Sequence, residues 1–456
     1  MDNKKPFNSY FYWLLISASL LITLNACEGT SRRSGAVTNQ NRESVPIGKW
    51  TMVSGDTRLD QPGVYGTRGT PVSTNKPGAR SGSISWKDNR DNLWLFGGSA
   101  GSGLPKFLND LWKFDGANWT WISGDKERNK RGIYGTKGVP GSANKPGARY
   151  GSISWYDKEG NLWLFGGYGF TAGEYPGALN DLWKFDGTSW TWVSGDEKIE
   201  RRGVYGTKGT ASATNKPGAR YDSMSWTDKK GNLWLFGGRG YSAGLSGKLN
   251  DLWKFDGENW TWISGDNIQD EPGIYGTKGI ADRANVPGSR YGGVSWTDSK
   301  GNLWLFGGIG STEIRTSGDL NDLWKFDGTN WTWVSGDKSD KRTGVYGFRG
   351  VADSNNKPGS RYGSIGWIDR EDNLWLFGGM GYNEIRSSLL NDLWKFDGIN
   401  WTWVSGKKSS DSPDKENEPD PRYYSISWTD SKGNLWLFGG QKNYSDNFND
   451  LWKYEP

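Results

Sequence analysis

Short apolar stretches, each bounded by turn residues, follow one another along most of the chain. A typical unit reads YGSISW at 150–155, a polar turn, NLWLFGG, a variable stretch, NDLWKFDG and WTWVSG. The apolar stretches are rich in Trp, Phe, Tyr, Val and Ile, which is typical of β-strands. The Asp-Gly pair of KFDG, as at Asp186 and Gly187, suits a tight hairpin turn between the third and fourth strands. The pattern therefore predicts four antiparallel strands per unit and no amphipathic helix.

This unit occurs six times. The segment LWLFGG begins at Leu93, Leu162, Leu233, Leu303, Leu374 and Leu435, so neighbouring units lie 61 to 71 residues apart. Such a repeat predicts a β-propeller, a closed ring of four-stranded blades, over residues 49–456. Each of the first five units contains five tryptophans, whereas the last contains three and lacks its fourth strand. The segment KWTMVSG at 49–55 matches the missing strand, so we expect the N-terminal strand around Trp50 to close the last blade.

An apolar strand that ends in Gly-Gly, followed by a spaced aromatic residue and then Trp, resembles the kelch motif of galactose-oxidase-like propellers. The resemblance covers residues 50–456 and implies an all-β, six-bladed kelch-type propeller. Each unit is longer than the usual kelch repeat of about 50 residues, and the surplus lies in one long loop. Because one fold hosts many activities, the motif is evidence for the fold rather than for an activity.

The first 26 residues have the pattern of a secretion signal. Lys4 and Lys5 precede an apolar run over 14–24 that is too short to span a bilayer unaided. The run ends in LNAC, which resembles the lipobox of bacterial lipoproteins and implies that Cys27 is acylated at a new N-terminus. An uncleaved anchor or a plain signal peptide is the alternative.

The residues that follow the cysteine suggest where the domain lies. By resemblance to lipoproteins, Glu28 implies transport to the outer membrane of a Gram-negative cell, with the domain on its periplasmic or cell-surface side. Residues 27–48 are polar and lack aromatic side chains, so they predict a flexible tether. We therefore expect membrane contact through the N-terminal lipid.

Composition excludes several kinds of chemistry. The chain contains one Cys and no His, so no disulfide, Cys-ligated zinc site, thiol nucleophile or Ser-His arrangement is expected in the mature protein. The copper chemistry of galactose oxidase needs histidines and a Cys crosslinked to Tyr, so the resemblance to that enzyme is one of fold. The formal net charge of +5 identifies no partner. We expect no metal, no cofactor and no nucleic acid.

The candidate site lies where long loops gather. In a four-stranded antiparallel blade, the loop between the second and third strands and the crossing to the next blade emerge on the same face, and loops that vary on a uniform scaffold suggest recognition. Each crossing ends in an arginine just before the innermost strand: Arg80, Arg149, Arg220, Arg290, Arg361 and Arg422. A tyrosine follows five of them: Tyr150, Tyr221, Tyr291, Tyr362 and Tyr423. Such a ring around the channel mouth suits bidentate contact with carboxylate, sulfate or phosphate, and stacking.

The arginines also admit a structural interpretation. In kelch domains that capture acidic peptides, arginines at this strand start resemble those that bind the ligand. Alternatively, each arginine hydrogen-bonds carbonyl groups of its own or the next blade, as suits a residue repeated in every unit. The Asp of NDLW recurs in the same way, which favours a hydrogen-bonding role over catalysis. The crossing over 405–422 departs from the others because it is short and acidic, and it either orients a dipolar or extended ligand or is a degenerate loop.

Three functions are compatible with these residues. The first is a lipid-anchored, extracytoplasmic binding module, monomeric, that takes an acidic glycan or an acidic peptide on the long-loop face. The second is a carbohydrate epimerase or mutarotase, implied by resemblance to bacterial kelch propellers that act on sialic acid. The third is a structural role in envelope assembly. Binding is the main expectation, and no catalytic residue is singled out.

Overall fold

The computed structural model describes residues 48–101, 106–409, 417–443 and 445–456. Those residues form strands and loops, and none of them forms a helix, so none could cross a membrane as a long apolar helix. The signal segment, Cys27 and the tether lie outside the described residues, as do Asp411, Asp414 and Glu416 of the acidic crossing. Lipidation and localisation therefore stay predictions.

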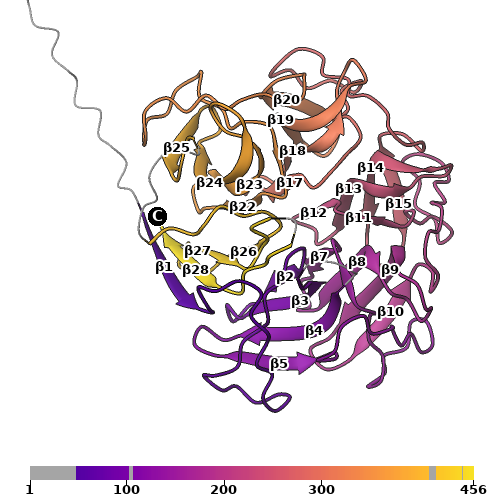
Figure 1. Ribbon diagram of the computed structural model, residues 1–456. Coiled ribbons are helices and arrows are strands. Elements are labelled where there is room, and N and C mark those ends of the chain that lie inside the picture. The colour runs from indigo at the N-terminus through magenta and orange to yellow at the C-terminus, as the bar shows by residue number, and fades with distance from the viewer. Residues whose placement is uncertain (1–47, 102–105, 410–416, 444) are drawn as a thin grey trace, which may run out of the picture. The chain divides into compact units, whose positions relative to one another are not determined.

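Six antiparallel sheets, or blades, surround a common axis, and the chain passes through them in order (Figure 1). Each blade has four strand positions, and in blades 2 to 5 the innermost position is divided into two short strands. Blade 1 contains β2 (Ile84–Lys87), β3 (Leu93–Ser99), β4 (Phe107–Phe114) and β5 (Trp119–Ser123). Blade 2 contains β6 (Arg149–Tyr150), β7 (Ile153–Tyr156), β8 (Leu162–Gly169), β9 (Gly177–Phe185) and β10 (Trp190–Ser194). Blade 3 contains β11 (Arg220–Tyr221), β12 (Met224–Thr227), β13 (Leu233–Tyr241), β14 (Ser246–Phe255) and β15 (Trp260–Ser264).

The second half of the ring repeats this arrangement. Blade 4 contains β16 (Arg290–Tyr291), β17 (Val294–Thr297), β18 (Leu303–Ser311), β19 (Ser317–Phe326) and β20 (Trp331–Ser335). Blade 5 contains β21 (Arg361–Tyr362), β22 (Ile365–Ile368), β23 (Leu374–Tyr382), β24 (Ser387–Phe396) and β25 (Trp401–Ser405). Blade 6 contains β26 (Ile426–Thr429), β27 (Leu435–Phe438), β28 (Leu451–Glu455) and β1 (Lys49–Ser54). The predicted six-bladed propeller is confirmed.

Blade 6 closes the ring as the sequence predicted. Strand β1 pairs antiparallel with β28, with Trp50 opposite Tyr454 and Met52 opposite Trp452. Segments from the two ends of the propeller thus share one sheet, so no blade is left with three strands.

The innermost strand differs from the prediction because it is interrupted in blades 2 to 5. In blade 3, β11 and β12 both pair with β13 but are separated by Asp222 and Ser223. The equivalent residue of each blade has a φ between 52° and 67°, the left-handed region that a continuous strand does not contain. The break turns the peptide group toward the axis, where the site lies.

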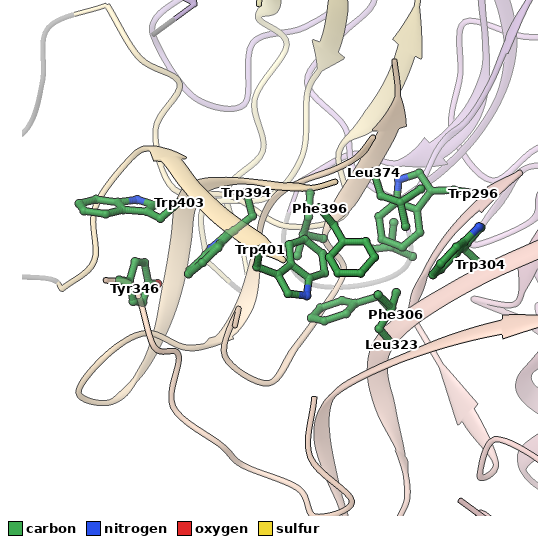
Figure 2. Packing of buried hydrophobic residues seen from close by; sticks show 12 residues of the cluster. Trp296, Trp304, Phe306, Leu323, Tyr346, Leu374, Trp394, Phe396, Trp401 and Trp403 are labelled. Atoms are coloured by element: carbon green, nitrogen blue, oxygen red, sulfur yellow. The ribbon is translucent and has the colours of Figure 1, made fainter. Parts of the chain in front are cut away.

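The core lies between neighbouring blades and is built mainly of indole rings. Figure 2 shows the packing between blades 4 and 5, where Trp394 is 0% exposed and Trp401 is 1% exposed. The ring of Trp401 lies 5.6 Å from that of Phe306 across the blade boundary, nearly edge to face. Burial of each such ring stabilises the fold by about 1.5 to 3 kcal/mol. These tryptophans are core residues and are not available for stacking on a ligand.

In blades 1 to 5, the crossing loop covers the outer strand of the blade that it enters. In blade 3, the ammonium group of Lys208 lies 4.3 Å from the ring centre of Trp262 and donates a hydrogen bond to the carbonyl of Gly265 at 2.8 Å. The amide of Gly209 donates to the carbonyl of Trp262 at 2.7 Å. Blade 6 lacks the YGTKG element, and Met52 takes the place of the tryptophan on which the lysine would stack. The missing loop element and the replacement of tryptophan by Met52 are thus related, since each removes one side of the same contact.

Candidate functional site

The six arginines that were predicted to line the channel mouth lie inside the blades. In blade 3, Nη1 of Arg220 donates to Oδ1 of Asp251 at 2.6 Å, and Nη2 donates to Oδ2 at 2.8 Å. The remaining donors bond the carbonyl groups of Gly218 and Gly237. The same bidentate pair forms in the other blades: Arg80–Asp110, Arg149–Asp181, Arg290–Asp322, Arg361–Asp392 and Arg422–Asp450. None of the six arginines is more than 2% exposed.

The aspartates of these pairs accept further hydrogen bonds. Oδ2 of Asp251 also accepts from Nε1 of Trp253 at 2.7 Å and from the hydroxyl of Tyr205 at 2.6 Å. Burial, followed by the charge of Asp251, raises the pKa of Tyr205 well above its ordinary value. In blade 3 the network uses four of the five guanidinium N–H donors of Arg220, and all six arginines are buried, so the expected ring of accessible arginines does not form. The structural interpretation of the arginines is the correct one, with the NDLW aspartate as the main partner.

The five predicted tyrosines do come together, around a pocket on the axis at the long-loop face. Tyr150, Tyr221, Tyr291, Tyr362 and Tyr423 all line this axial pocket, whose volume is about 460 Å³. Phe107, Tyr168 and Tyr424 add further rings, and neighbouring rings are close, as between Tyr168 and Tyr221, with centres 5.5 Å apart. A pocket of this size, walled by aromatic rings with a few polar groups, has the usual character of a small-molecule site.

A closed ring of six backbone hydrogen bonds forms the floor of the axial pocket. The equivalent residue of each blade donates its amide to the carbonyl of the blade before it, at 2.7 to 2.9 Å: Gly82, Gly151, Asp222, Gly292, Gly363 and Tyr424. All six have a positive φ, which suits glycine because it has no Cβ. We call this ring the throat. Four of its members are glycine, and two carry side chains.

The two side chains of the throat meet across the axis. Asp222 belongs to blade 3 and Tyr424 to the opposite blade 6, and the Tyr424 hydroxyl donates a hydrogen bond to Oδ2 of Asp222 at 3.3 Å. Burial raises the pKa of Asp222 to about 7, although the Tyr424 hydroxyl and the charge of Arg239 oppose the shift. Burial, reinforced by the charge of Asp222, raises the pKa of Tyr424 well above its ordinary value.

Arg239 supplies an accessible cation at the wall. It follows the Gly-Gly pair of β13, is exposed, and its guanidinium carbon lies 5.9 Å from the ring centre of Tyr291. The nearby hydroxyls of Tyr221 and Tyr291 raise the pKa of Arg239. Asp222 and Arg239 are the charged members of the described lining, and they form no ion pair within 4.0 Å of each other. The axial pocket therefore presents one cation and one titratable acid at separate places.

Asp222, Tyr424 and Arg239 were not among the site residues predicted from the sequence. All three depart from the repeat: Asp222 and Tyr424 stand where four blades have Gly, and Arg239 stands where others have Ser99, Tyr168, Ile309, Met380 or Gln441. A comparison of equivalent positions among the six units would have shown these departures. That Asp222 and Tyr424 face the axis follows only from the broken inner strand.

Of the further cavities, two are comparable in volume with the axial pocket. One of about 500 Å³ lies between blades 5 and 6 and includes Trp375, Lys395 and Tyr454 in its lining. The other, of about 400 Å³, lies at the opposite end of the axis and is lined by the inner strands, including Ser85 and Ser154. Among the described residues, no group of three or more acidic, His or Cys side chains is placed to hold a metal ion. Neither cavity joins aromatic walls to an accessible cation and a half-buried acid as the axial pocket does.

These features define the class of protein: an all-β propeller of six four-stranded blades, with a tyrosine-lined pocket on its axis. No model of a known protein family matches the chain. The structure of the protein YjhT is similar at a TM-score of 0.51 and 15% identity, covering 82% of this chain and 95% of that one. At this identity, the similarity concerns the fold alone.

Two further solved structures are similar at lower scores. A fungal alcohol oxidase of the AA5 family, in complex with copper, has a TM-score of 0.45 and 14% identity, covering 86% of this chain and 77% of that one. A protein of unknown function from Dyadobacter fermentans has a TM-score of 0.48 and 9% identity, covering 90% of this chain and all of that one (100%).

Proposed function

We propose that the protein is a lipid-anchored, extracytoplasmic binding module whose axial pocket takes an acidic saccharide. The main support for this proposal is that Arg239 and a wall of tyrosine rings line the same pocket of about 460 Å³. Tyrosine rings present flat apolar faces for the CH groups of a sugar and hydroxyls for its polar rim. The guanidinium of Arg239 suits a carboxylate, which it can hold through two parallel hydrogen bonds. Anchoring at Cys27 to the outer membrane belongs to this proposal and is supported by the N-terminal sequence.

The test is binding of oligosaccharides that end in a uronic acid, measured by calorimetry beside their neutral counterparts. We expect the acidic form to bind more tightly, binding to weaken with added salt, and Arg239→Ala to reduce affinity about tenfold or more. Arg315→Ala is the matched control, because Arg315 is an exposed arginine whose guanidinium contacts Glu271 instead of the pocket. Equal binding of acidic and neutral sugars, or an Arg239→Ala variant that binds like the wild type, would contradict the proposal.

A second candidate function is a sugar epimerase or mutarotase. The observation that favours it is Asp222, whose pKa of about 7 lies near neutral pH, where an acid can both give and take a proton. The assay is the exchange of anomers of an acidic sugar, followed by NMR, with Asp222→Asn as the inactive variant. A wild-type rate no higher than that of buffer would end this alternative without affecting the binding proposal.

A further inference from the structure

In the throat, two of the six equivalent residues differ from the other four. Its backbone ring requires a positive φ at every member, and Gly82, Gly151 and their equivalents provide it without strain. Asp222 adopts φ 52° and Tyr424 adopts φ 53° instead. Asp tolerates this region, whereas a bulky residue such as Tyr is an outlier there, and such outliers cost about 1 to 3 kcal/mol. Strain of this kind at the floor of a pocket indicates that the two side chains serve the pocket rather than the fold.

The carboxylate of Asp222 retains room for another donor. An ionised carboxylate can accept about four hydrogen bonds, and the side chain of Asp222 receives one long bond, from the Tyr424 hydroxyl at 3.3 Å. The aspartates inside the blades differ, since each is paired with an arginine and bonded by a tryptophan. No ion pair forms between Asp222 and Arg239, so the acid at the floor and the cation at the wall are left without a charge partner in the described chain.

A ligand that satisfies both groups must be dipolar. We propose that the acidic ligand of the axial pocket also carries a protonated amine, which lies against Asp222 while its carboxylate lies against Arg239. The inference rests on the proposed function and names a second recognition group for the same site. The electron-rich faces of the surrounding tyrosines favour the same charge, because a cation over an aromatic ring is attracted by the ring's quadrupole.

The amine contact makes binding depend on pH. Several groups from four blades face Asp222 and set its titration: Arg239, Tyr150, Tyr221, Tyr291 and Tyr424. Arginine and the tyrosines keep their protons near neutral pH, so Asp222 is the group that titrates there. An ammonium group prefers the ionised form of Asp222. Affinity for the amine should therefore rise as pH increases through about 7, with release of a proton on binding.

The experiment compares two probes, 2-aminoethyl glucuronide and 2-hydroxyethyl glucuronide, with the whole mature protein. A primary alkylamine titrates near pH 10, so it stays protonated from pH 5.5 to pH 8. At pH 8 we expect the amine probe to bind about tenfold more tightly than the hydroxyl probe, as for one charge-assisted hydrogen bond. At pH 5.5 the difference should shrink to about twofold or less.

Two variants connect the effect to the throat. Asp222→Asn keeps a side chain that tolerates a positive φ, and Asp222→Gly restores the residue found in four of the six blades, so both should fold. Each should remove the preference for the amine probe over the hydroxyl probe at every pH, because neither Asn nor Gly carries the negative charge that an ammonium group prefers.

The outcomes separate the two proposals. If both probes bind the wild type equally at every pH, or if the amine preference survives in both Asp222 variants, the dipolar inference is wrong and the acidic-saccharide proposal stands. If neither glucuronide binds, the proposed function fails, and the inference fails with it.

Discussion

Charged residues that recur in all six blades as buried arginine–aspartate pairs serve the fold, whereas each of the two charged residues of the axial pocket occurs in one unit. Arg220 and Asp251 have counterparts in every blade and bond each other where no solvent reaches. Asp222 and Arg239 have no charged counterpart in the other blades, and both line the axial pocket. In this repeat, departure from the pattern is therefore a better sign of chemistry than the pattern itself.

The first prediction contrasts two arginines of blade 3. Arg220→Ala would leave the carboxylate of Asp251 buried without its counter-charge, so we expect the free energy of unfolding to fall by about 3 to 5 kcal/mol. Arg239→Ala should change it by about 0.5 kcal/mol or less, because Arg239 is exposed and forms no ion pair in the described chain. Urea unfolding followed by tryptophan fluorescence measures both. Similar losses in the two variants would contradict the division between structural and pocket arginines.

The second prediction concerns Asp222 and pH. Its pKa in the folded protein, about 7, lies above its ordinary value of 3.8, so the folded state binds more protons between these values. The contribution of Asp222 to stability is therefore present at low pH and is lost as pH rises through about 7. Asp222→Asn has no group that titrates there, so it does not show this loss. The free energy of unfolding of the variant, relative to that of the wild type, should therefore rise by on the order of 2 kcal/mol from pH 5 to pH 8.

Unfolding midpoints in urea at the two pH values give the comparison, and Asp319→Asn is a useful control. Asp319 also has a pKa raised by burial, to about 6, but it does not line the axial pocket. It should therefore show a smaller gain, completed at lower pH. A stability difference between Asp222→Asn and wild type that does not change with pH would show that Asp222 is not held in a buried, protonated form.

At the scale of strands and loops, each outer strand and its crossing loop form one unit. The loop of blade 3 is held to β15 by the stacking of Lys208 on Trp262 and by the amide of Gly209. In blade 6 the loop element and the second tryptophan are both missing, and Met52 lies in that place. The tryptophan thus serves the loop more than the blade, because β1 pairs with β28 without it.

The third prediction follows from this contact between the crossing loop and the outer strand. Trp262→Met should loosen the loop around Lys208 without unfolding blade 3, because the variant copies the outer strand of blade 6. Hydrogen exchange of the Gly209 amide should accelerate by about tenfold or more, while amides of β13 and β14 keep their protection. Met52→Trp is the reverse control and should alter no loop. Unchanged exchange at Gly209 would show that the loop is held by other contacts.

At the scale of the whole molecule, stability depends on closure of the ring. Trp50 of β1 is 4% exposed, and its ring packs against Phe377 and Tyr454, with centres 5.3 and 5.1 Å away. It therefore connects blade 6 to blade 5 while its strand completes blade 6. A propeller with one open boundary would expose indole-rich surface on both sides of the gap.

The fourth prediction tests this closure. Trp50→Ala should lower the free energy of unfolding by about 3 to 5 kcal/mol, the usual cost of removing a large aromatic side chain from a core. Thr51→Ala, on the exposed side of the same strand, should change it by about 0.5 kcal/mol or less. Thermal unfolding of the two variants beside the wild type provides the measurement. Equal melting temperatures would mean that β1 contributes little to the closed ring.

The sequence by itself determined the number of blades, the strands of each blade and the strand that closes the ring. It could do so because these features depend on local patterns, namely alternation of apolar residues, turn residues and a fixed repeat. It also placed five tyrosines together, since residues equivalent in a closed repeat must lie at equivalent distances from the axis.

Only the tertiary structure decided which way the arginines point and which residues meet at the centre. Arg220 and Asp251 are 31 residues apart, and their bond depends on two strands facing the same side of one sheet. Asp222 and Tyr424 are 202 residues apart and meet because the inner strands break at a positive φ and turn toward the axis. Side-chain direction and contact across the ring are properties of the assembled blades, and no local pattern in the chain specifies them.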